Sequence, residues 1–125
     1  MINKNFRYAV IGASHDEEKY GFKVFKDLID SGYNVVPINP KGGELLGKKV
    51  WPSVLDFDDK IDVAIMVIPS SVGLKVLENI KLKKIGKVWF QPGSESDELV
   101  NYCREYGIEC MTNACIMIER KKQSN

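Results

Sequence analysis

The sequence of 125 residues lacks the features that mark several classes of protein. No apolar run approaches the roughly 18 residues that cross a membrane, and the opening residues Met1–Asn5 carry no signal-peptide pattern. Eighteen basic side chains nearly cancel seventeen acidic ones, which leaves a formal net charge of +1. This balance gives no general reason to expect a nucleic acid or a membrane as a partner. We therefore expect a soluble cytoplasmic protein.

Cysteine and histidine are also scarce. The three cysteines, Cys103, Cys110 and Cys115, form an odd set without a Cys-x-x-Cys pair, and His15 is the only histidine. The pattern favours reduced thiols over a disulfide framework. No serine–histidine–aspartate arrangement or metal-ligand spacing surrounds His15. The sequence thus predicts neither a metal site nor an acid–base pair for catalysis.

The clearest local pattern lies near the start of the chain. A continuous apolar run over residues 8–11 is typical of a strand buried on both faces, which we expect over residues 6–11. The small residues Gly12-Ala13-Ser14 follow and would let phosphates approach the main-chain N–H groups. Apolar positions then recur at helical spacing over residues 20–31, and Gly32 stands where a helix cap is expected. This segment predicts a strand, a turn and a helix.

The rest of the chain repeats the alternation of strand and helix. Further strands are expected over residues 34–38, 62–68, 87–91 and 108–111, with a short extra strand over 48–51. Serine caps predict one helical turn over 53–57, a helix from Ser70-Ser71 to about Lys84 and a helix from Ser94 to about Tyr106. In the helix after Ser70-Ser71, the Val72 side chain should point inward. In the strand over residues 34–38, Pro37 indicates a strand end or a bulge. Residues 112–119 should trail over the surface.

Strands that alternate with helices predict an α/β fold. We expect a Rossmann-like, doubly wound parallel sheet of five to six strands, covered by helices on both faces in a single three-layer domain. The domain should span residues 1–125, with its core over about 5–119 and a frayed basic tail over 120–125.

Ligands of such sheets bind beyond the carboxyl ends of the strands. The residues expected at these ends are Gly12, Ala13, Ser14, Asn39, Pro40, Lys41, Pro69, Ser70, Gln91, Gly93, Asn113 and Cys115. This set is small and polar, and it contains no catalytic pair. It therefore favours binding over chemistry.

Two lysines near these ends are candidates for phosphate binding. The first turn departs from the dinucleotide fingerprint, because Ser14 and Glu17 stand where glycines would be. The second strand is followed by Asn39-Pro40-Lys41 and not by the aspartate or glutamate that bonds the ribose hydroxyls of a dinucleotide. Lys41 at this place favours a ligand with an extra phosphate on the ribose. Lys19 is a second cation that could meet a pyrophosphate. The alternative for both is a solvated surface lysine.

An ordered set of motifs now points to a family. The run 9–14, the segment Ser31-Gly32-Tyr33, the run 36–41, and Leu46-Gly47 before residues 51–54 resemble the small stand-alone CoA-binding domain proteins. These are similar to the N-terminal domain of the succinyl-CoA synthetase alpha subunit. The resemblance covers about residues 5–119 and implies a Rossmann-like fold that holds coenzyme A across the strand ends.

The resemblance also implies a role for each matching residue. Gly12, Ala13 and Ser14 would face the pyrophosphate, and Lys19 occupies the position of a family arginine that meets phosphate. Asn39, Pro40 and Lys41 would border the 3′-phosphate of the adenosine. Pro69 and Ser70 would line the pocket floor, Gln91 and Gly93 would flank the pantetheine path, and Asn113 and Cys115 match the closing loop near the thiol.

Two departures from the family pattern bear on function. Many small relatives carry Phe-Arg where this chain has Val67-Ile68, and Ile116 replaces a proline after the closing-loop cysteine. We expect a module that binds coenzyme A or acyl-CoA without turnover of its own, either as a homo-oligomer or with a protein partner. The alternatives are a small NADP- or nucleotide-dependent oxidoreductase that uses His15 or Cys115, and an interaction protein with a decayed pocket.

Overall fold

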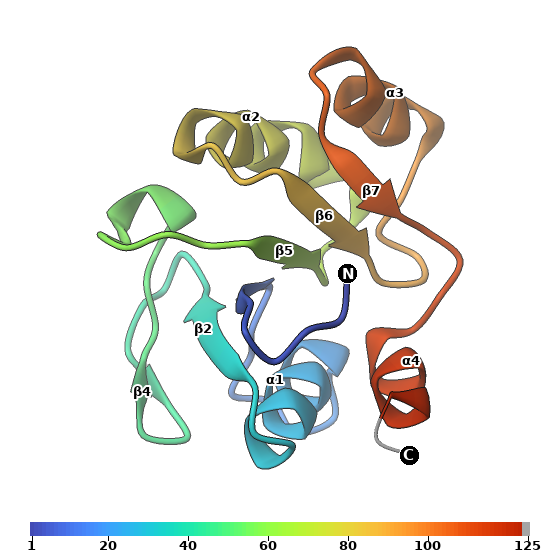
Figure 1. Cartoon of the computed structure of the whole chain (residues 1–125). Coiled ribbons are helices and arrows are strands. Elements are labelled where there is room, and N and C mark those ends of the chain that lie inside the picture. The colour runs from blue at the N-terminus through green and yellow to red at the C-terminus, as the bar shows by residue number, and fades with distance from the viewer. Residues whose placement is uncertain (124–125) are drawn as a thin grey trace.

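The computed structural model describes residues 1–123, and its centre is a five-stranded parallel sheet (Figure 1). The strand order across the sheet is β2 (Asn34–Ile38), β1 (Arg7–Ile11), β5 (Val63–Met66), β6 (Lys87–Phe90) and β7 (Glu109–Met111). All four neighbouring pairs run parallel. The doubly wound α/β fold predicted from the sequence is confirmed.

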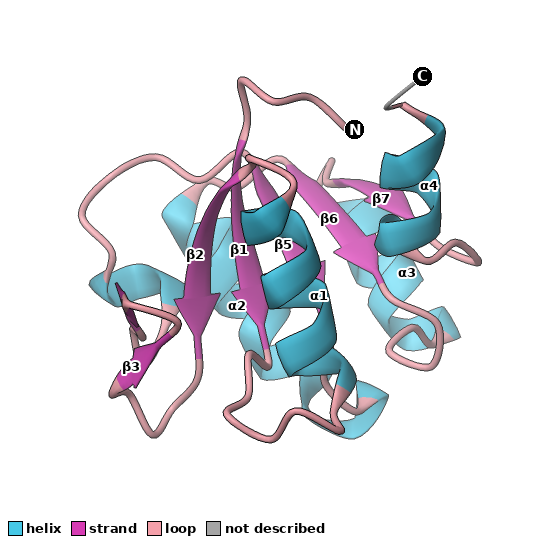
Figure 2. Cartoon of the chain, turned by 90° about the horizontal axis from the view of Figure 1, so that it is seen from below, coloured by secondary structure: helices cyan, strands magenta, loops and turns pink. Residues whose placement is uncertain are grey.

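Helices cover both faces of the sheet (Figure 2). One face carries α1 (Tyr20–Asp30) and α4 (Ile116–Lys122), and the other carries α2 (Gly73–Lys83) and α3 (Asp97–Glu105). Side chains of β1 point alternately to the two faces of the sheet. Tyr8 and Val10 pack in the hydrophobic cluster that includes α1, while Ala9 and Ile11 pack in the cluster that includes α2 and α3. A strand that is buried on both faces has a continuous run of apolar residues, and this is why β1 could be predicted from the sequence.

The chain changes direction across the sheet between β1 and β5. It passes from β1 to β2 on one side and then returns to β5 on the other side of β1. The loops that follow β1 and β5 therefore leave the sheet in different directions, and the crevice between them is the usual ligand position in open α/β sheets. Within residues 1–123, none of the helices has the length and apolar character of a membrane span.

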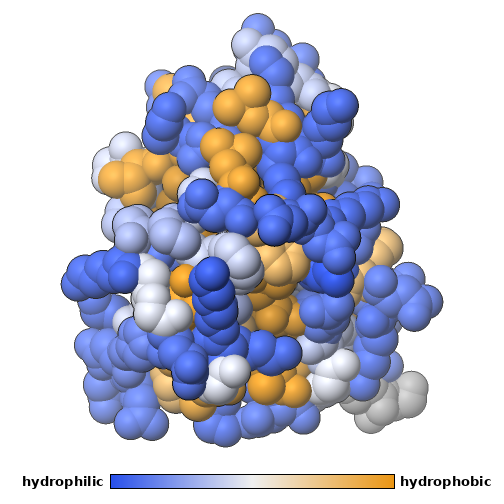
Figure 3. All heavy atoms as spheres, turned by 90° about the vertical axis from the view of Figure 1, so that its left-hand side faces the viewer, coloured by the Kyte–Doolittle hydropathy of each residue, from blue (hydrophilic) through white to orange (hydrophobic). Residues whose placement is uncertain are grey.

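A polar excursion connects β2 to β5. It contains the antiparallel pair β3 (Glu44–Leu45) and β4 (Lys48–Lys49) and the 3-10 turn η1 (Val54–Asp56). The Oγ of Ser53 accepts a hydrogen bond from the Leu55 N–H at 3.2 Å, so the predicted cap is confirmed. Figure 3 shows the side of the molecule that carries this excursion, where hydrophilic side chains surround separate apolar patches.

Pro37 does not mark a strand end or a bulge, and that prediction is wrong. It lies inside β2 in regular register with Val10 of β1. Because β2 is at the edge of the sheet, the missing N–H removes no bond to a neighbouring strand. The Pro37 carbonyl instead accepts a hydrogen bond from the Trp51 N–H at 3.0 Å.

Two helix starts differ from the prediction. The cap of α3 is Ser96, whose Oγ accepts a hydrogen bond from the Leu99 N–H at 3.2 Å, while Ser94 is buried before the helix begins. Ser70 and Ser71 belong to the 3-10 turn η2 (Ser70–Val72), and neither side chain caps α2. Val72 is 52% exposed and does not point inward. In both places the chain makes an extra turn before the α-helix starts.

The last helix, α4, was not predicted. Residues 112–119 do not simply trail over the surface, and the basic residues from Arg120 to Lys122 are not frayed, because residues 116–122 are helical. Ile116 is buried, and Arg120 bonds the Asp27 carboxylate of α1 with its Nη2 at 2.6 Å and its Nε at 3.1 Å. The final residues of the predicted tail, 124–125, lie outside the described residues.

Candidate ligand site at the carboxyl ends of the strands

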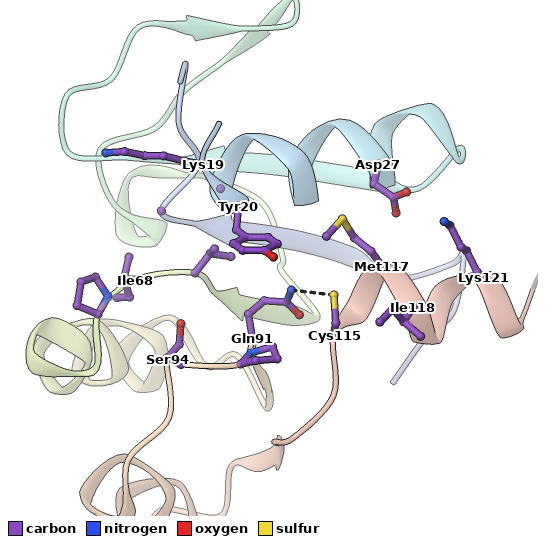
Figure 4. Close-up of a pocket in the computed structure, with 16 residues that line it drawn as sticks. Lys19, Tyr20, Asp27, Ile68, Gln91, Ser94, Cys115, Met117, Ile118 and Lys121 are labelled. Atoms are coloured by element: carbon purple, nitrogen blue, oxygen red, sulfur yellow. Dashed lines mark hydrogen bonds between the residues drawn. The ribbon is translucent and has the colours of Figure 1, made fainter. Parts of the chain in front are cut away.

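A cavity of about 670 Å³ lies at the carboxyl ends of β1, β5 and β6 and extends between α1 and α4 (Figure 4). Six of the thirteen residues predicted for the site line it: Gly12, Lys19, Pro69, Gln91, Gly93 and Cys115. They come from four separate loops and helix starts. The parallel topology brings them together, as the sequence analysis expected.

The end of the cavity near β1 is formed by closely packed backbone. Gly12 has a φ of +100°, and a Cβ on it would lie 2.2 Å from the Val67 carbonyl oxygen. A Cβ on Gly21, in the first turn of α1, would lie 1.9 Å from the Gly12 carbonyl oxygen. Glycine at both positions lets the turn after β1, the end of β5 and the start of α1 meet.

The free N–H groups are not the ones that the sequence suggested. The N–H groups of Gly12 and Ala13 both donate to the Ile38 carbonyl, at 3.0 and 3.2 Å. Within residues 1–123, the N–H groups of Ser14, Tyr20 and Gly21 find no acceptor, and no side chain caps α1. The unsatisfied donors therefore gather at the start of α1, where the helix dipole also favours an anion.

The residues after β2 lie beside this turn but not on the cavity wall. Asn39 donates from its Nδ2 to the Ala13 carbonyl at 2.8 Å and accepts the Lys41 N–H at its Oδ1 at 2.9 Å. Pro40 and Lys41 are exposed next to it. In the part of the chain that the structure describes, the Lys41 and Lys19 side chains have no ion-pair partner. Two free ammonium groups thus flank the first turn.

Gln91 fastens the start of α4 to the end of β6. Its side chain is 4% exposed; its Oε1 accepts the Ile116 N–H at 2.8 Å, and its Nε2 donates to the Cys115 sulfur at 3.4 Å (Figure 4). The Trp89 indole donates to the Ala114 carbonyl at 2.9 Å. Two side chains of one short segment therefore hold Cys115 at the cavity wall. The sequence placed Gln91 at the site but did not indicate this anchoring role.

Ser94 is a polar group that the sequence assigned to a helix cap and not to the site. It is 5% exposed and lines the cavity, with its hydroxyl turned toward the interior (Figure 4). Among the described residues, this hydroxyl has no hydrogen-bond partner, although the Ser94 N–H donates to the Gln91 carbonyl at 2.9 Å. The hydroxyl faces the cavity, so it is available to bond with a ligand there.

The far end of the cavity was not predicted from the sequence. The additional lining residues come from two helices: Tyr20 and Asp27 from α1, and Met117, Ile118 and Lys121 from α4. They were missed because α4 was not predicted. The basic side chains in the last turn of α4 are one signal that could have revealed a helix end, since they complement the dipole there.

Three further predicted residues lie away from this cavity. Asn113, at a φ of +61°, lines a separate hollow of about 620 Å³ together with Glu95 and Asn101. Ser70 follows Pro69 in η2 but is not on the wall, and the Ala13 side chain is buried in the core. Asn113 and Cys115 lie in the one short loop between β7 and α4, but they border different hollows.

Of His15 and Cys115, either of which could serve the oxidoreductase alternative, Cys115 lines the cavity. His15 is exposed, its Nε2 contacts the Glu44 carbonyl oxygen, and it does not line the cavity that Cys115 lines. Cys103 is fully buried, and burial together with the neighbouring Cys110 raises the pKa of its thiol to about 12. Cys103 is thus a core thiol.

Comparison with known proteins identifies this arrangement. The family model of the CoA binding domain matches residues 7–121. The chain belongs to this family. In solved structures, a conserved hypothetical protein from Pyrococcus furiosus is similar to this CoA binding domain, with a TM-score of 0.88 and 38% identity, over 91% of this chain and 98% of that one.

Curated relatives include both long and short proteins. The alpha subunit of ADP-forming acetate–CoA ligase I from Pyrococcus furiosus is 34% identical, over 82% of this chain and 26% of the relative. An uncharacterized Bacillus subtilis protein, YneT, is 27% identical, over 94% of this chain and 87% of the relative. This CoA binding domain spans about a quarter or less of the length of the first ligases that it matches.

Proposed function

We propose that this CoA binding domain holds coenzyme A, or an acyl-CoA, in the cavity at the strand ends and has no turnover of its own. The observation that carries the proposal is the meeting of six family-matched residues on one cavity wall. The cavity lies at the topological switch point, where open α/β sheets bind nucleotides. It also joins a cluster of unsatisfied N–H groups to a more apolar channel, which suits a ligand with a phosphate end and a pantetheine arm.

Each part of coenzyme A has a matching environment in this proposal. The pyrophosphate lies at the start of α1, near the free N–H groups of Tyr20 and Gly21 and the Lys19 ammonium. The 3′-phosphate of the adenosine lies outside the cavity beside Lys41. The pantetheine arm passes Pro69 and Gln91, and the thiol ends near Cys115. Ser94 offers its unpartnered hydroxyl to an amide of the arm.

The apolar pair Val67-Ile68 should weaken this binding. Both residues line the cavity, at the place where many relatives carry Phe-Arg. A charge-assisted hydrogen bond contributes about 1.5–3 kcal/mol, so loss of the arginine corresponds to roughly tenfold weaker binding or more. We expect a functional pocket with modest affinity and not the decayed pocket of the interaction-protein alternative.

We propose the absence of turnover because of the side chains that line the cavity. The titratable side chains on it are Lys19, Tyr20, Asp27, Cys115 and Lys121. The Asp27 carboxylate is paired with Arg120, and within residues 1–123 no hydrogen bond joins a nucleophile to a base on this wall. Because a relative is the alpha subunit of a ligase, we propose that a separate protein partner uses the bound ligand.

Thermal unfolding with four ligands tests the proposal. Coenzyme A, 3′-dephospho-CoA, NADP and NAD are each added at a few hundred micromolar in matched samples. A ligand that binds only the folded state raises the free energy of unfolding by about 2.7 kcal/mol at a hundred times its Kd. We expect the largest rise in Tm with coenzyme A and a smaller rise with dephospho-CoA.

Lys41→Gln and Lys84→Gln form the matched pair of variants for this experiment. Lys41→Gln should remove the difference between coenzyme A and dephospho-CoA, because Lys41 meets the 3′-phosphate. Lys84 is also exposed, but it precedes β6 and so lies toward the amino ends of the strands, opposite the cavity, and its variant should behave like the parent. A shift with NADP alone would favour the oxidoreductase alternative, and no shift with any ligand would contradict the proposal.

A further inference from the structure

The cavity does not end at Cys115. Figure 4 shows Gln91 and Cys115 between two ends: Lys19 and Ile68 on one side, and Met117, Ile118 and Lys121 on the other. The second end lies between α1 and α4 and extends away from the start of α1, where the free N–H groups that suit phosphates lie. A ligand whose sulfur reaches Cys115 would therefore still have empty space in front of it.

The length of this second end follows from helix geometry. Cys115 and Lys121 are six residues apart along α4, and a helix rises about 1.5 Å per residue, so the wall continues for about 9 Å beyond Cys115. On the facing helix, Tyr20 and Asp27 both line the cavity, and their seven-residue separation corresponds to about 10 Å. Three bonds of an extended chain span about 3.5 Å. The channel thus matches a chain of roughly eight bonds.

The chemistry of the second end is mainly apolar. Tyr20 is 63% exposed and Ile118 is 58% exposed, and both line the cavity. Met117 lies between them and the core, and its flexible side chain can adapt to chains of different shape. The Asp27 carboxylate is already paired with Arg120, so it does not present an uncompensated negative charge to the channel. Apolar side chains that border a cavity and contact water favour an apolar ligand.

We propose that the channel between α1 and α4 is an acyl subsite, which holds an unbranched apolar acyl chain of about four to six carbons on a coenzyme A thioester. The inference rests on the proposed function, because the thioester sulfur must lie near Cys115. The acyl chain then lies over Tyr20, Met117 and Ile118, and its far end reaches Lys121 at the outlet.

Chain length should control affinity. Full burial of one methylene group tightens binding by about threefold to fourfold, and a half-open channel should give about twofold per methylene. Hexanoyl-CoA carries four more methylene groups than acetyl-CoA, so we expect it to bind roughly fifteenfold more tightly. Free coenzyme A should bind about as well as acetyl-CoA, because neither places a chain in the channel.

Isothermal titration with coenzyme A, acetyl-CoA, butyryl-CoA and hexanoyl-CoA tests this subsite. The parent is compared with Ile118→Ser, which removes one apolar wall, and with Leu82→Ser. Leu82 is 69% exposed on α2 and does not line the cavity, so its variant is a matched control. Both changes are on the surface and leave the core intact. Ile118→Ser should lose most of the gain with chain length and keep the affinity for free coenzyme A.

The outcomes separate this inference from the proposed function. Equal affinities for coenzyme A and hexanoyl-CoA in the parent would overturn the acyl subsite and leave coenzyme A binding intact. A gain with chain length that Ile118→Ser and Leu82→Ser reduce equally would also overturn it. No heat with any of the four ligands, from a chain that still unfolds cooperatively, would overturn the proposed function and the subsite together.

Discussion

At the scale of single residues, the contact between Gly12 and Gly21 fixes the phosphate end of the cavity. A Cβ at position 21 would lie 1.9 Å from the Gly12 carbonyl oxygen, which is a backbone atom and cannot rotate away. Gly21→Ala should therefore push α1 off the turn after β1. Overpacking of this kind reduces the free energy of unfolding by about 1–3 kcal/mol, to be measured by urea denaturation.

Gly86→Ala is the control for this change. A Cβ at Gly86 would meet no atom within 4 Å, and its φ is not in the left-handed region. The same chemical change should alter the free energy of unfolding by no more than about 0.5 kcal/mol there. Equal losses in the two variants would mean that the close approach of α1 to the turn does not limit stability.

At the scale of secondary-structure elements, the sequence revealed those whose signal is local. The strand before Gly12 and the helix that starts at Tyr20 follow from a continuous apolar run and from helical spacing. The helix α4 has only seven residues, too few to be stable alone. It is held by distant partners, namely the Gln91 amide and the Asp27 carboxylate. No local pattern in the sequence of α4 could reveal these contacts.

The same distinction explains which parts of the site were predictable. Gly12, Pro69 and Gln91 follow strands directly, so the parallel topology alone gathers them at one edge. Ile118 and Lys121 line the cavity only because α4 packs beside α1. Ser94 was misassigned because Ser96 two residues later offers the same cap chemistry, and the burial of Ser94 is decided by tertiary packing.

The ion pair between Arg120 and Asp27 should be the main fastening of α4 to α1. It is bidentate, and its side chains are only 11% and 21% exposed. Arg120→Gln leaves a partly buried carboxylate without its charged partner, so it should lower the free energy of unfolding by about 2 kcal/mol. It should also weaken coenzyme A binding, because Asp27 and α4 form one wall of the cavity.

Lys26→Gln provides the comparison on the same helix. It removes the Lys26–Asp30 pair, whose side chains are 51% and 59% exposed. An exposed pair of this spacing contributes about 0.3–0.5 kcal/mol, so urea denaturation should detect little change and the affinity for coenzyme A should not move. If Arg120→Gln behaved in the same way, α4 would have to be held by Gln91 and Ile116 alone.

At the scale of the whole molecule, the hydrophobic cluster on each face of the sheet contains a weakly acidic side chain that folding keeps protonated. Burial raises the pKa of Tyr8, on the α1 side, above its ordinary value of 10.0. Burial raises the pKa of Cys103, on the α3 side, from 9.0 to about 12. Both groups are neutral when protonated, so the folded state holds these protons more tightly than the unfolded state does.

The sign of the pH dependence follows from linkage. The stabilisation is fully present below the unfolded pKa values of about 9–10 and is lost as the pH rises through them toward 12. The free energy of unfolding should therefore be nearly level from pH 7 to 8.5 and fall from pH 9 to 11. Cys103→Ala should be less stable at pH 7, because it leaves a cavity in a fully buried position. The free energy of unfolding of this variant should nevertheless fall less steeply above pH 9, since the thiol with the raised pKa is absent. A parent whose stability stayed level up to pH 11 would contradict the assignment of both buried protons.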